Sequence, residues 1–175
     1  YEAFHQDNVE AVNVRNNPIT RITSTGIELE DGSHHEVDVI VMATGFDAGT
    51  GSLTRIDLRG RGGRSLAEEW GKDIRSTMGI MIEGFPNLLN TGIPLAPSAA
   101  LCNMTTCLQQ QTEWITDVVK HMQSNGLQII EPTVEGEQSW VDHHDEIANA
   151  TLVPKSHSWY TGANVPGKPT GRLLS

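Results

Sequence analysis

The 175-residue sequence predicts an α/β fold, and three observations support this. The first fifty residues contain short β-branched stretches separated by turn signals, which is typical of antiparallel strands. Residues 37–42 form an apolar run of strand length, which suits a strand buried on both faces of a parallel sheet. Residues 98–124 repeat apolar side chains at a helical period, which predicts a long amphipathic helix.

A β-meander is predicted before the buried strand. Residues 8–14 alternate apolar and polar side chains, and residues 19–23 and 26–30 are β-branched stretches. Asn16-Asn17-Pro18 supplies a turn after the first segment, and Asp31-Gly32 is a strong hairpin signal after the third. These signals predict consecutive antiparallel strands.

Short elements are expected between the buried strand and the long helix. Residues 47–63 are rich in Gly, Arg, Asp and Ser and read as a connector. Residues 65–70 predict a helix with Ser65 as N-cap and Glu68 as its capping-box partner. Two brief strands, residues 79–84 and 88–92, are flanked by Gly and Pro.

The second half is predicted to be helical, followed by a long loop. The stripe of the first helix consists of Leu101, Met104, Leu108, Ile115, Val118, Val119 and Met122. Asn125-Gly126 predicts its end, and a second helix is expected from Glu135 or Glu137 to Ala150. Residues 153–172 contain three prolines and three glycines without periodicity, so we expect a loop there.

Composition excludes several classes of function. The net charge of −10 would repel a nucleic-acid backbone or an anionic membrane. No run of 18 apolar residues and no export signal occur, so we expect a soluble, cytoplasmic protein. Cys102 and Cys107 lack zinc-site spacing and cannot build a disulfide framework, which fits a reducing compartment; beside the helix stripe they are expected to pack.

The usual catalytic signatures do not occur in the sequence. The histidine pairs His34-His35 and His143-His144 match no H-E-x-x-H or H-x3-H pattern, so no metal site is predicted. No G-x-S-x-G nucleophile elbow occurs. We therefore expect no catalytic residue in this chain.

Three segments suggest a bound cofactor. Thr44 and Gly45 follow the buried strand, where α/β sheets bind ligands and small residues let backbone approach them. Residues 84–98 lead into Asn103-Met104 at the start of the long helix, whose N-terminus favours anions. Residues 158–168 place Trp159-Tyr160 among glycines and end in Lys168, a clamp that could stack on a ring and meet a phosphate.

Together, these segments resemble Baeyer–Villiger monooxygenases of the cyclohexanone monooxygenase type. Residues 39–48 with 50–53 are similar to the family's ATG strand and its continuation, and residues 84–104 to the segment lining the flavin and substrate pocket. Residues 158–168 are similar to the mobile control loop over the nicotinamide site, and this match is the most specific of the three. The resemblance covers residues 8–168.

The resemblance implies a flavin enzyme that uses FAD, NADP(H) and O2 to insert one oxygen atom beside a ketone carbonyl, giving an ester or lactone. It implies that Trp159 contacts NADP and Met104 contacts the flavin. The cofactor-binding residues expected on all these grounds are Trp159, Met104, Asn103, Thr44, Gly45 and Lys168. The substrate pocket would include Leu101 and Ser98, although the stretch around them departs from the family pattern.

The resemblance also implies a Rossmann-like flavoprotein with two dinucleotide-binding domains, of which this chain is a part. Residues 1–36 would end the NADP-binding domain and residues 37–175 would belong to the FAD-binding domain. No G-x-G-x-x-G turn occurs, and both ends look cut, so an N-terminal portion with the nucleotide-binding turns and the active-site arginine is expected upstream. The alternatives are an N-hydroxylating or dimethylaniline-type flavin monooxygenase and a non-catalytic binding module.

Overall fold

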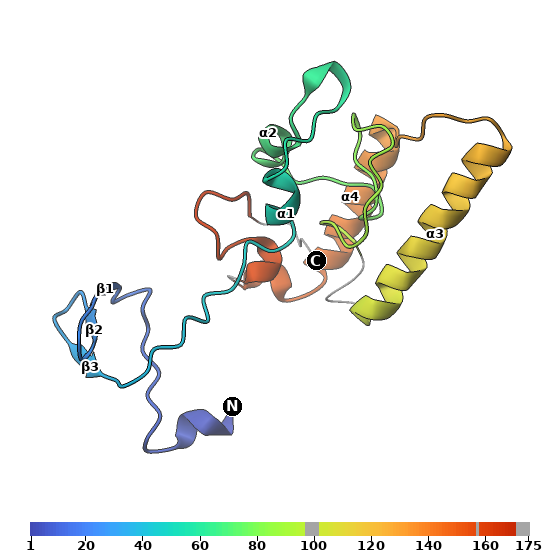
Figure 1. Cartoon of the computed structure of the whole chain (residues 1–175). Coiled ribbons are helices and arrows are strands. Elements are labelled where there is room, and N and C mark those ends of the chain that lie inside the picture. Colours follow the sequence, from blue (N-terminus) through green and yellow to red (C-terminus); the bar gives the residue numbers. More distant parts are fainter. Residues whose placement is uncertain (97–101, 157, 171–175) are drawn as a thin grey trace. The chain divides into compact units, whose positions relative to one another are not determined.

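The computed structural model describes residues 1–96, 102–156 and 158–170. Its internal contacts divide the chain into two compact units, Tyr1–Gly45 and Phe46–Ser175, here called unit 1 and unit 2 (Figure 1). Among the described residues, no helix is both long enough and apolar enough to cross a membrane. The predicted division into NADP-binding and FAD-binding parts stays a prediction.

Unit 1 contains a β-meander whose first two strands match two of the predicted stretches, whereas its third strand lies at residues for which no strand was predicted. Strands β1 (Ile19–Ile22), β2 (Gly26–Leu29) and β3 (His34–Glu36) pair antiparallel in the order β1-β2-β3, after a short 3-10 turn, η1 (Glu2–His5). The Asp31-Gly32 turn joins β2 to β3, as predicted, with Gly32 at a φ of +83°. Hydrogen bonds from the Ser33 hydroxyl and backbone N–H hold the pKa of Asp31 below its ordinary value.

Two predicted strands of unit 1 do not form. Residues 8–14 contain turns and irregular backbone in place of a strand, and residues 37–42 belong to no strand. Val39 and Val41 are 76% and 80% exposed, so the run expected to be buried is open to solvent. A parallel strand exists only through hydrogen bonds to neighbouring strands; the Val37 N–H donates to the Thr25 carbonyl at 3.1 Å, but the described residues form no strand ladder with residues 37–42. The predicted parallel sheet is therefore not formed within the described residues, and the Rossmann-like fold stays a prediction.

Unit 2 packs short elements and one helix around a hydrophobic core. Helix α1 (Gly51–Thr54), the 3-10 turn η2 (Arg61–Gly63) and helix α2 (Leu66–Trp70) precede a long irregular segment, residues 71–96. The segment is joined to α3 (Met104–Ser124) on one side and to α4 (Val134–Asn149) on the other. The core consists of Leu66, Trp70, Ile74, Ile82, Phe85, Ile93, Leu95 and Val141.

The helices of unit 2 follow the sequence signals more closely than the strands do. Helix α3 ends at Ser124, with Gly126 at a φ of +65°, but begins at Met104 because Asn103 caps it. Helix α4 begins at Val134, capped by the hydroxyl of Thr133. Ser65 is the N-cap residue of α2, but its side chain makes no capping bond, so the predicted capping box with Glu68 does not form.

The predicted strands at residues 79–84 and 88–92 are irregular backbone. Only one isolated pairing, between Thr77 and Met81, occurs near the first of them. Gly79 has a φ of +63°, and a Cβ at that position would lie 2.2 Å from the Cβ of Ala96. Left-handed backbone and such a close approach are incompatible with a regular strand.

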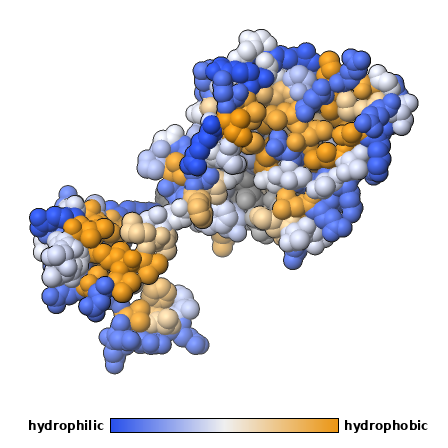
Figure 2. Space-filling model, viewed as in Figure 1, coloured by the Kyte–Doolittle hydropathy of each residue, from blue (hydrophilic) through white to orange (hydrophobic). Residues whose placement is uncertain are grey.

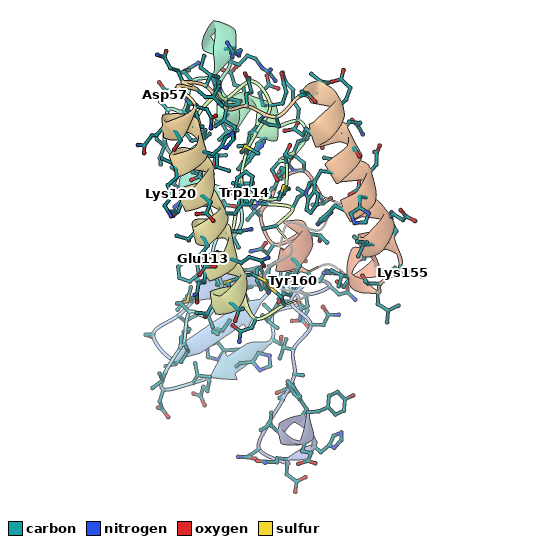
Figure 3. All side chains as sticks on the ribbon, turned by 90° about the vertical axis from the view of Figure 1, so that its right-hand side faces the viewer. Asp57, Glu113, Trp114, Lys120, Lys155 and Tyr160 are labelled. Atoms are coloured by element: carbon teal, nitrogen blue, oxygen red, sulfur yellow. A yellow bond between two sulfur atoms is a disulfide. The ribbon has the colours of Figure 1, made fainter. Side chains whose placement is uncertain are left out.

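One side of α3 is only partly covered. A groove of about 320 Å³ lies between α3 and residues 127–130. Its apolar lining consists of Trp114, Val118, Met122, Leu127, Ile129 and Ile130. Trp114 lies on the side of α3 that faces the rest of unit 2, and Lys120 on the outer side (Figure 3). Figure 2 shows hydrophobic residues at the surface of both units.

Candidate cofactor site

The loop predicted to clamp a cofactor forms a compact turn in unit 2. Its centre is the 3-10 turn η4 (Trp159–Thr161), which Ser158 caps by accepting a hydrogen bond from the Tyr160 N–H at 3.2 Å. Gly162 closes the turn in the left-handed region at a φ of +74°. The rings of Trp159 and Tyr160 stack with centroids 4.0 Å apart, and Trp159 is still 45% exposed. The indole is thus oriented by its neighbour and available for a second ring.

This loop is fastened to the residues that follow the ATG motif. The ammonium of Lys168 donates to the carboxylate Oδ1 of Asp47 at 2.8 Å and to the carbonyl of Ala48 at 2.6 Å. The side-chain amide of Asn164 donates to the Phe46 carbonyl at 3.0 Å. Within unit 2 the loop is therefore attached to residues 46–48, which follow the ATG motif in the sequence.

Lys168 was predicted from its sequence position to meet a phosphate. In the structure its side chain is 7% exposed and its ammonium is engaged by Asp47 and Ala48. A phosphate contact by Lys168 stays a prediction, and it would require the ammonium to leave these two acceptors. Sequence reasoning missed Asp47 as a site residue; its local signal is its place two residues after the ATG motif.

The segment resembling the pocket lining is held by two carboxylates that sequence reasoning also missed. Glu131 accepts from the Gly84 N–H at 3.0 Å, and Glu137 accepts from the Glu83 N–H at 2.8 Å. Each also binds an arginine: Arg61 pairs with Glu131 at 2.7 Å, and Arg75 pairs with the buried Glu137 at 3.2 Å. The consecutive backbone N–H groups of Glu83 and Gly84 are thus held by carboxylates on α4 and just before it.

These ion pairs shift the pKa of their members. The side-chain hydrogen bond from Arg61, and then its charge, lower the pKa of Glu131, and the same bond raises the pKa of Arg61. Arg64 lies between Glu69 and Glu83, and hydrogen bonds to them raise its pKa. The cations of the arginine-rich connector are therefore matched by carboxylates of the chain itself.

The irregular segment of residues 71–96 contains strained backbone. Met78, Asn87 and Leu95 have φ angles of 59°, 61° and 66°, a region that non-glycine residues rarely adopt. The side-chain amide of Asn87 donates to the Gln128 carbonyl at 3.0 Å and accepts from the Ile130 N–H at 3.0 Å, and its backbone N–H donates to the Ile130 carbonyl at 2.9 Å. The fully buried Leu95 accepts a bond from the indole N–H of Trp140 at 3.1 Å. Strained residues that the surroundings fix in this way are common at functional sites.

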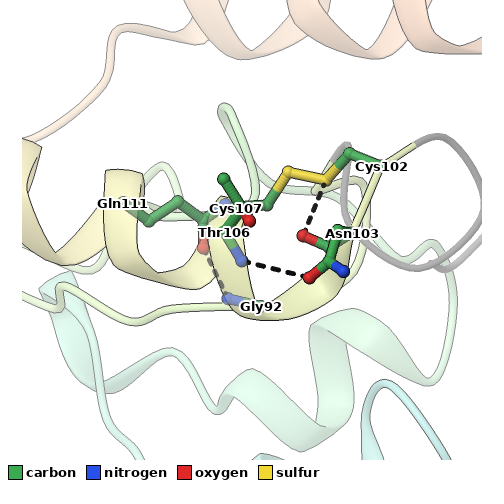
Figure 4. Close-up of a disulfide and its surroundings, with 6 residues drawn as sticks. All are labelled: Gly92, Cys102, Asn103, Thr106, Cys107 and Gln111. Atoms are coloured by element: carbon green, nitrogen blue, oxygen red, sulfur yellow. Dashed lines mark hydrogen bonds between the residues drawn. A yellow bond between two sulfur atoms is a disulfide. The ribbon is translucent and has the colours of Figure 1, made fainter.

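The start of α3 combines an exposed methionine with a disulfide. Asn103 caps the helix by accepting from the Thr106 N–H at 3.4 Å (Figure 4). Met104 is 47% exposed. Cys102 and Cys107 form a disulfide with Cα atoms 6.7 Å apart, within the bridging range. The prediction that these cysteines only pack is therefore wrong, because one turn of helix brings Cys107 back beside Cys102.

The remaining predicted site residues divide between unit 1 and the undescribed positions. Thr44 and Gly45 are exposed at the end of unit 1, with Gly45 at a φ of +79° and no atom within 4 Å of an added Cβ. Leu101 and Ser98, predicted for the substrate pocket, lie outside the described residues. No group of three or more His, Cys, Asp or Glu side chains in the described ranges could hold a metal ion.

The residues present fit a flavin and a nicotinamide nucleotide as ligands. Within unit 2, Trp159 and Met104 both offer exposed surface where a planar ring or a ligand chain could lie. Within the described segment 77–90, two buried polar atoms, Thr77 Oγ1 and Asn90 Nδ2, have no hydrogen-bond partner. Buried polar atoms of this kind are normally satisfied by a ligand, water or another part of the protein.

Comparison with known proteins tests the resemblance directly. No family model matches the chain. The chain is 66% identical over 174 residues to an acetone monooxygenase (methyl acetate-forming) of Gordonia sp. (strain TY-5), covering 99% of this chain and 32% of the relative. It is 42% identical to a Baeyer-Villiger monooxygenase of Pseudooceanicola batsensis, covering 96% and 30%, and 36% identical to the phenazine N-monooxygenase PhzNO1 of Lysobacter antibioticus, covering 99% and 31%.

Solved structures agree with the sequence matches. A closed crystal structure of cyclohexanone monooxygenase superposes with a TM-score of 0.83 at 42% identity, covering 99% of this chain and 32% of that chain. A structure of OTEMO in complex with FAD and NADP gives a TM-score of 0.83 at 34% identity, covering 100% and 32%. The predicted resemblance is thus confirmed: over nearly its whole length the chain matches a segment of Baeyer–Villiger monooxygenases, and it spans about a third of their length.

Proposed function

We propose that this chain is part of a longer cytoplasmic protein, here called the parent protein, that inserts one oxygen atom beside a ketone carbonyl. The parent protein would use FAD, NADPH and O2 and yield an ester or a lactone. The observation that carries the proposal is the 66% identity to an acetone monooxygenase over 99% of the chain. The same proposal assigns the nucleotide-binding turns to an N-terminal portion of the parent protein.

FAD supplies the redox chemistry when it is bound, and the residues of this chain would bind, orient and shield it. Trp159, stacked on Tyr160 and partly exposed, would lie against the nicotinamide nucleotide. Met104 would contact the flavin through its exposed side chain, close to the α3 N-terminus capped by Asn103. Thr44 and Gly45 would let backbone approach the cofactor. These roles agree with the exposure of each residue.

The substrate pocket would include Leu101 and Ser98, and the neighbouring strained segment would give it shape. Because Glu131 and Glu137 hold the Gly84 and Glu83 N–H groups, this wall of the pocket would be rigid. A rigid wall supports a defined position of the ketone relative to the cofactor, which is the main contribution a protein makes when a cofactor carries the chemistry.

An N-hydroxylating monooxygenase is the second candidate, favoured by the 36% identity to a phenazine N-monooxygenase. Incubating the parent protein with NADPH and either acetone, cyclohexanone or an aromatic amine separates the two. We expect ester or lactone from the ketones, found by gas chromatography, at one NADPH consumed for each product. Formation of N-oxide alone would favour the second candidate, and no NADPH-dependent product from any of the three would favour a binding module.

A further inference from the structure

We infer that Asp47 and Lys168 form a latch that positions the loop of residues 158–168, and hence Trp159. The inference rests on the proposed function for its catalytic consequence, although the latch itself is a feature of unit 2. Asp47 and Lys168 would be positioning residues, because neither needs to touch the cofactor. Their effect would pass through the loop backbone to the indole.

The latch joins segments that are far apart in the chain. Lys168 and Asp47 are separated by 121 residues, and both are partly or largely buried, with side chains 7% and 28% exposed. Lys168 also donates to the Ala48 carbonyl, so two acceptors hold one ammonium. Asn164 adds a second attachment, to the Phe46 carbonyl. Together, these hydrogen bonds attach the loop to three consecutive residues, Phe46 to Ala48.

Packing keeps the carboxylate of Asp47 in place. A Cβ at Gly51 would lie 2.6 Å from the Cγ of Asp47, so the first turn of α1 is in close contact with this side chain. A carboxylate held beside a short helix has little freedom to follow a departing lysine. The latch therefore has a fixed half, Asp47 with α1, and a half carried by the loop, Lys168.

The loop has the backbone freedom that such a device needs. Gly162 and Gly167 adopt φ angles of 74° and 79°, on either side of Asn164. Loops that cover a nicotinamide or flavin site commonly move between open and closed positions. Breaking a largely buried ion pair by removing one partner is costly, since it leaves the other charge uncompensated. The latch would thus favour the position of Trp159 seen here.

The latch and the phosphate contact predicted from the sequence use the same ammonium, so they make opposite predictions. If Lys168 held a phosphate, Asp47→Asn would free it and leave cofactor use intact or improved. If Lys168 belongs to the latch, Asp47→Asn and Lys168→Met should act alike. NADPH and NADH differ only by a phosphate, so a latch defect should lower kcat/KM for both by the same factor.

The test compares Asp47→Asn, Lys168→Met and the double variant in the parent protein, with Lys155→Met as a matched control. Lys155 is an exposed lysine of the neighbouring turn η3 (Val153–Lys155) (Figure 3). Chymotrypsin cleavage after Trp159 and Tyr160 reports loop release, and hydrogen peroxide per NADPH consumed reports lost coupling. We expect both single variants to raise cleavage on the order of tenfold, the double variant to add little, and the control to match wild type.

Unchanged cleavage in Asp47→Asn would overturn the latch. A fall in kcat/KM for NADPH alone, confined to Lys168→Met, would assign Lys168 to the phosphate. Lys168→Arg keeps the charge and should restore most of the protection, which separates the latch from a general loss of folding. If wild type forms no product from ketones, the proposed function fails, while the cleavage ratio still decides the latch.

Discussion

Two apolar regions of the molecule behave in opposite ways. Leu66, Leu95 and Val141 of unit 2 are almost completely buried, whereas Val39, Val41 and Met42 of unit 1 are at least 70% exposed. Both regions have apolar sequences of the kind that forms a core. The first finds partners on α2, α4 and the segment between them, and no described residue pairs with the second. Apolarity thus predicts burial only where the chain also supplies the neighbour.

The largest effect that tests this contrast is expected when one side chain in each region is shortened. Leu66→Ala removes a fully buried side chain and should lower the free energy of unfolding by about 2–5 kcal/mol. Val41→Ala in the 175-residue chain should change it by less than about 0.5 kcal/mol, because the side chain is already in water. Urea unfolding followed by tryptophan fluorescence measures both. Equal losses in the two variants would contradict the contrast.

A smaller effect is expected from the carboxylate of Glu131, whose contribution to the stability of unit 2 should depend on pH. The pKa of Glu131 is lowered from 4.5 by Arg61, so its charged form is favoured in the folded state. The stability it contributes is therefore complete above pH 4.5 and is lost as the pH falls through the lowered pKa. Glu131→Gln should be less stable than wild type at pH 7, and the difference should shrink in acid.

The matched control for this prediction is Glu146→Gln, which alters an exposed carboxylate on α4. Thermal unfolding between neutral pH and the acid limit of solubility compares the three proteins. If the difference in stability between wild type and Glu131→Gln were the same at every pH, the predicted contribution of the charged Glu131 would be wrong. A difference that grows in acid would reverse the sign of the pKa argument.

Local sequence signals explain which parts of the fold could be predicted. Strands β1 and β2, the Asp31-Gly32 turn and the end of α3 follow from turn and helix patterns within a few residues. Residues 37–42 and 79–84 were predicted as strands from their composition, but strand formation depends on partners that composition does not specify. The start of α3 at Met104 depended on the cap that Asn103 supplies.

The candidate site shows the same limit. The unusual Trp159-Tyr160 pair among glycines identified the loop, and the structure shows the two rings stacked. Asp47, Glu131 and Glu137 were missed, because each acts on a segment at least 47 residues away in the chain. A carboxylate with a distant partner looks like any surface acid in a single sequence.

The central claim is that the loop of residues 158–168 serves an NADPH-dependent flavin monooxygenase through Trp159. The most direct measurement is the ratio of hydrogen peroxide to ester formed per NADPH in wild type, Trp159→Phe and Trp159→Ala of the parent protein, with a ketone present. The account predicts a low ratio in wild type, a markedly higher ratio in Trp159→Ala and an intermediate value in Trp159→Phe, because an aromatic ring keeps part of the stacking. The same ratio in all three proteins would contradict it.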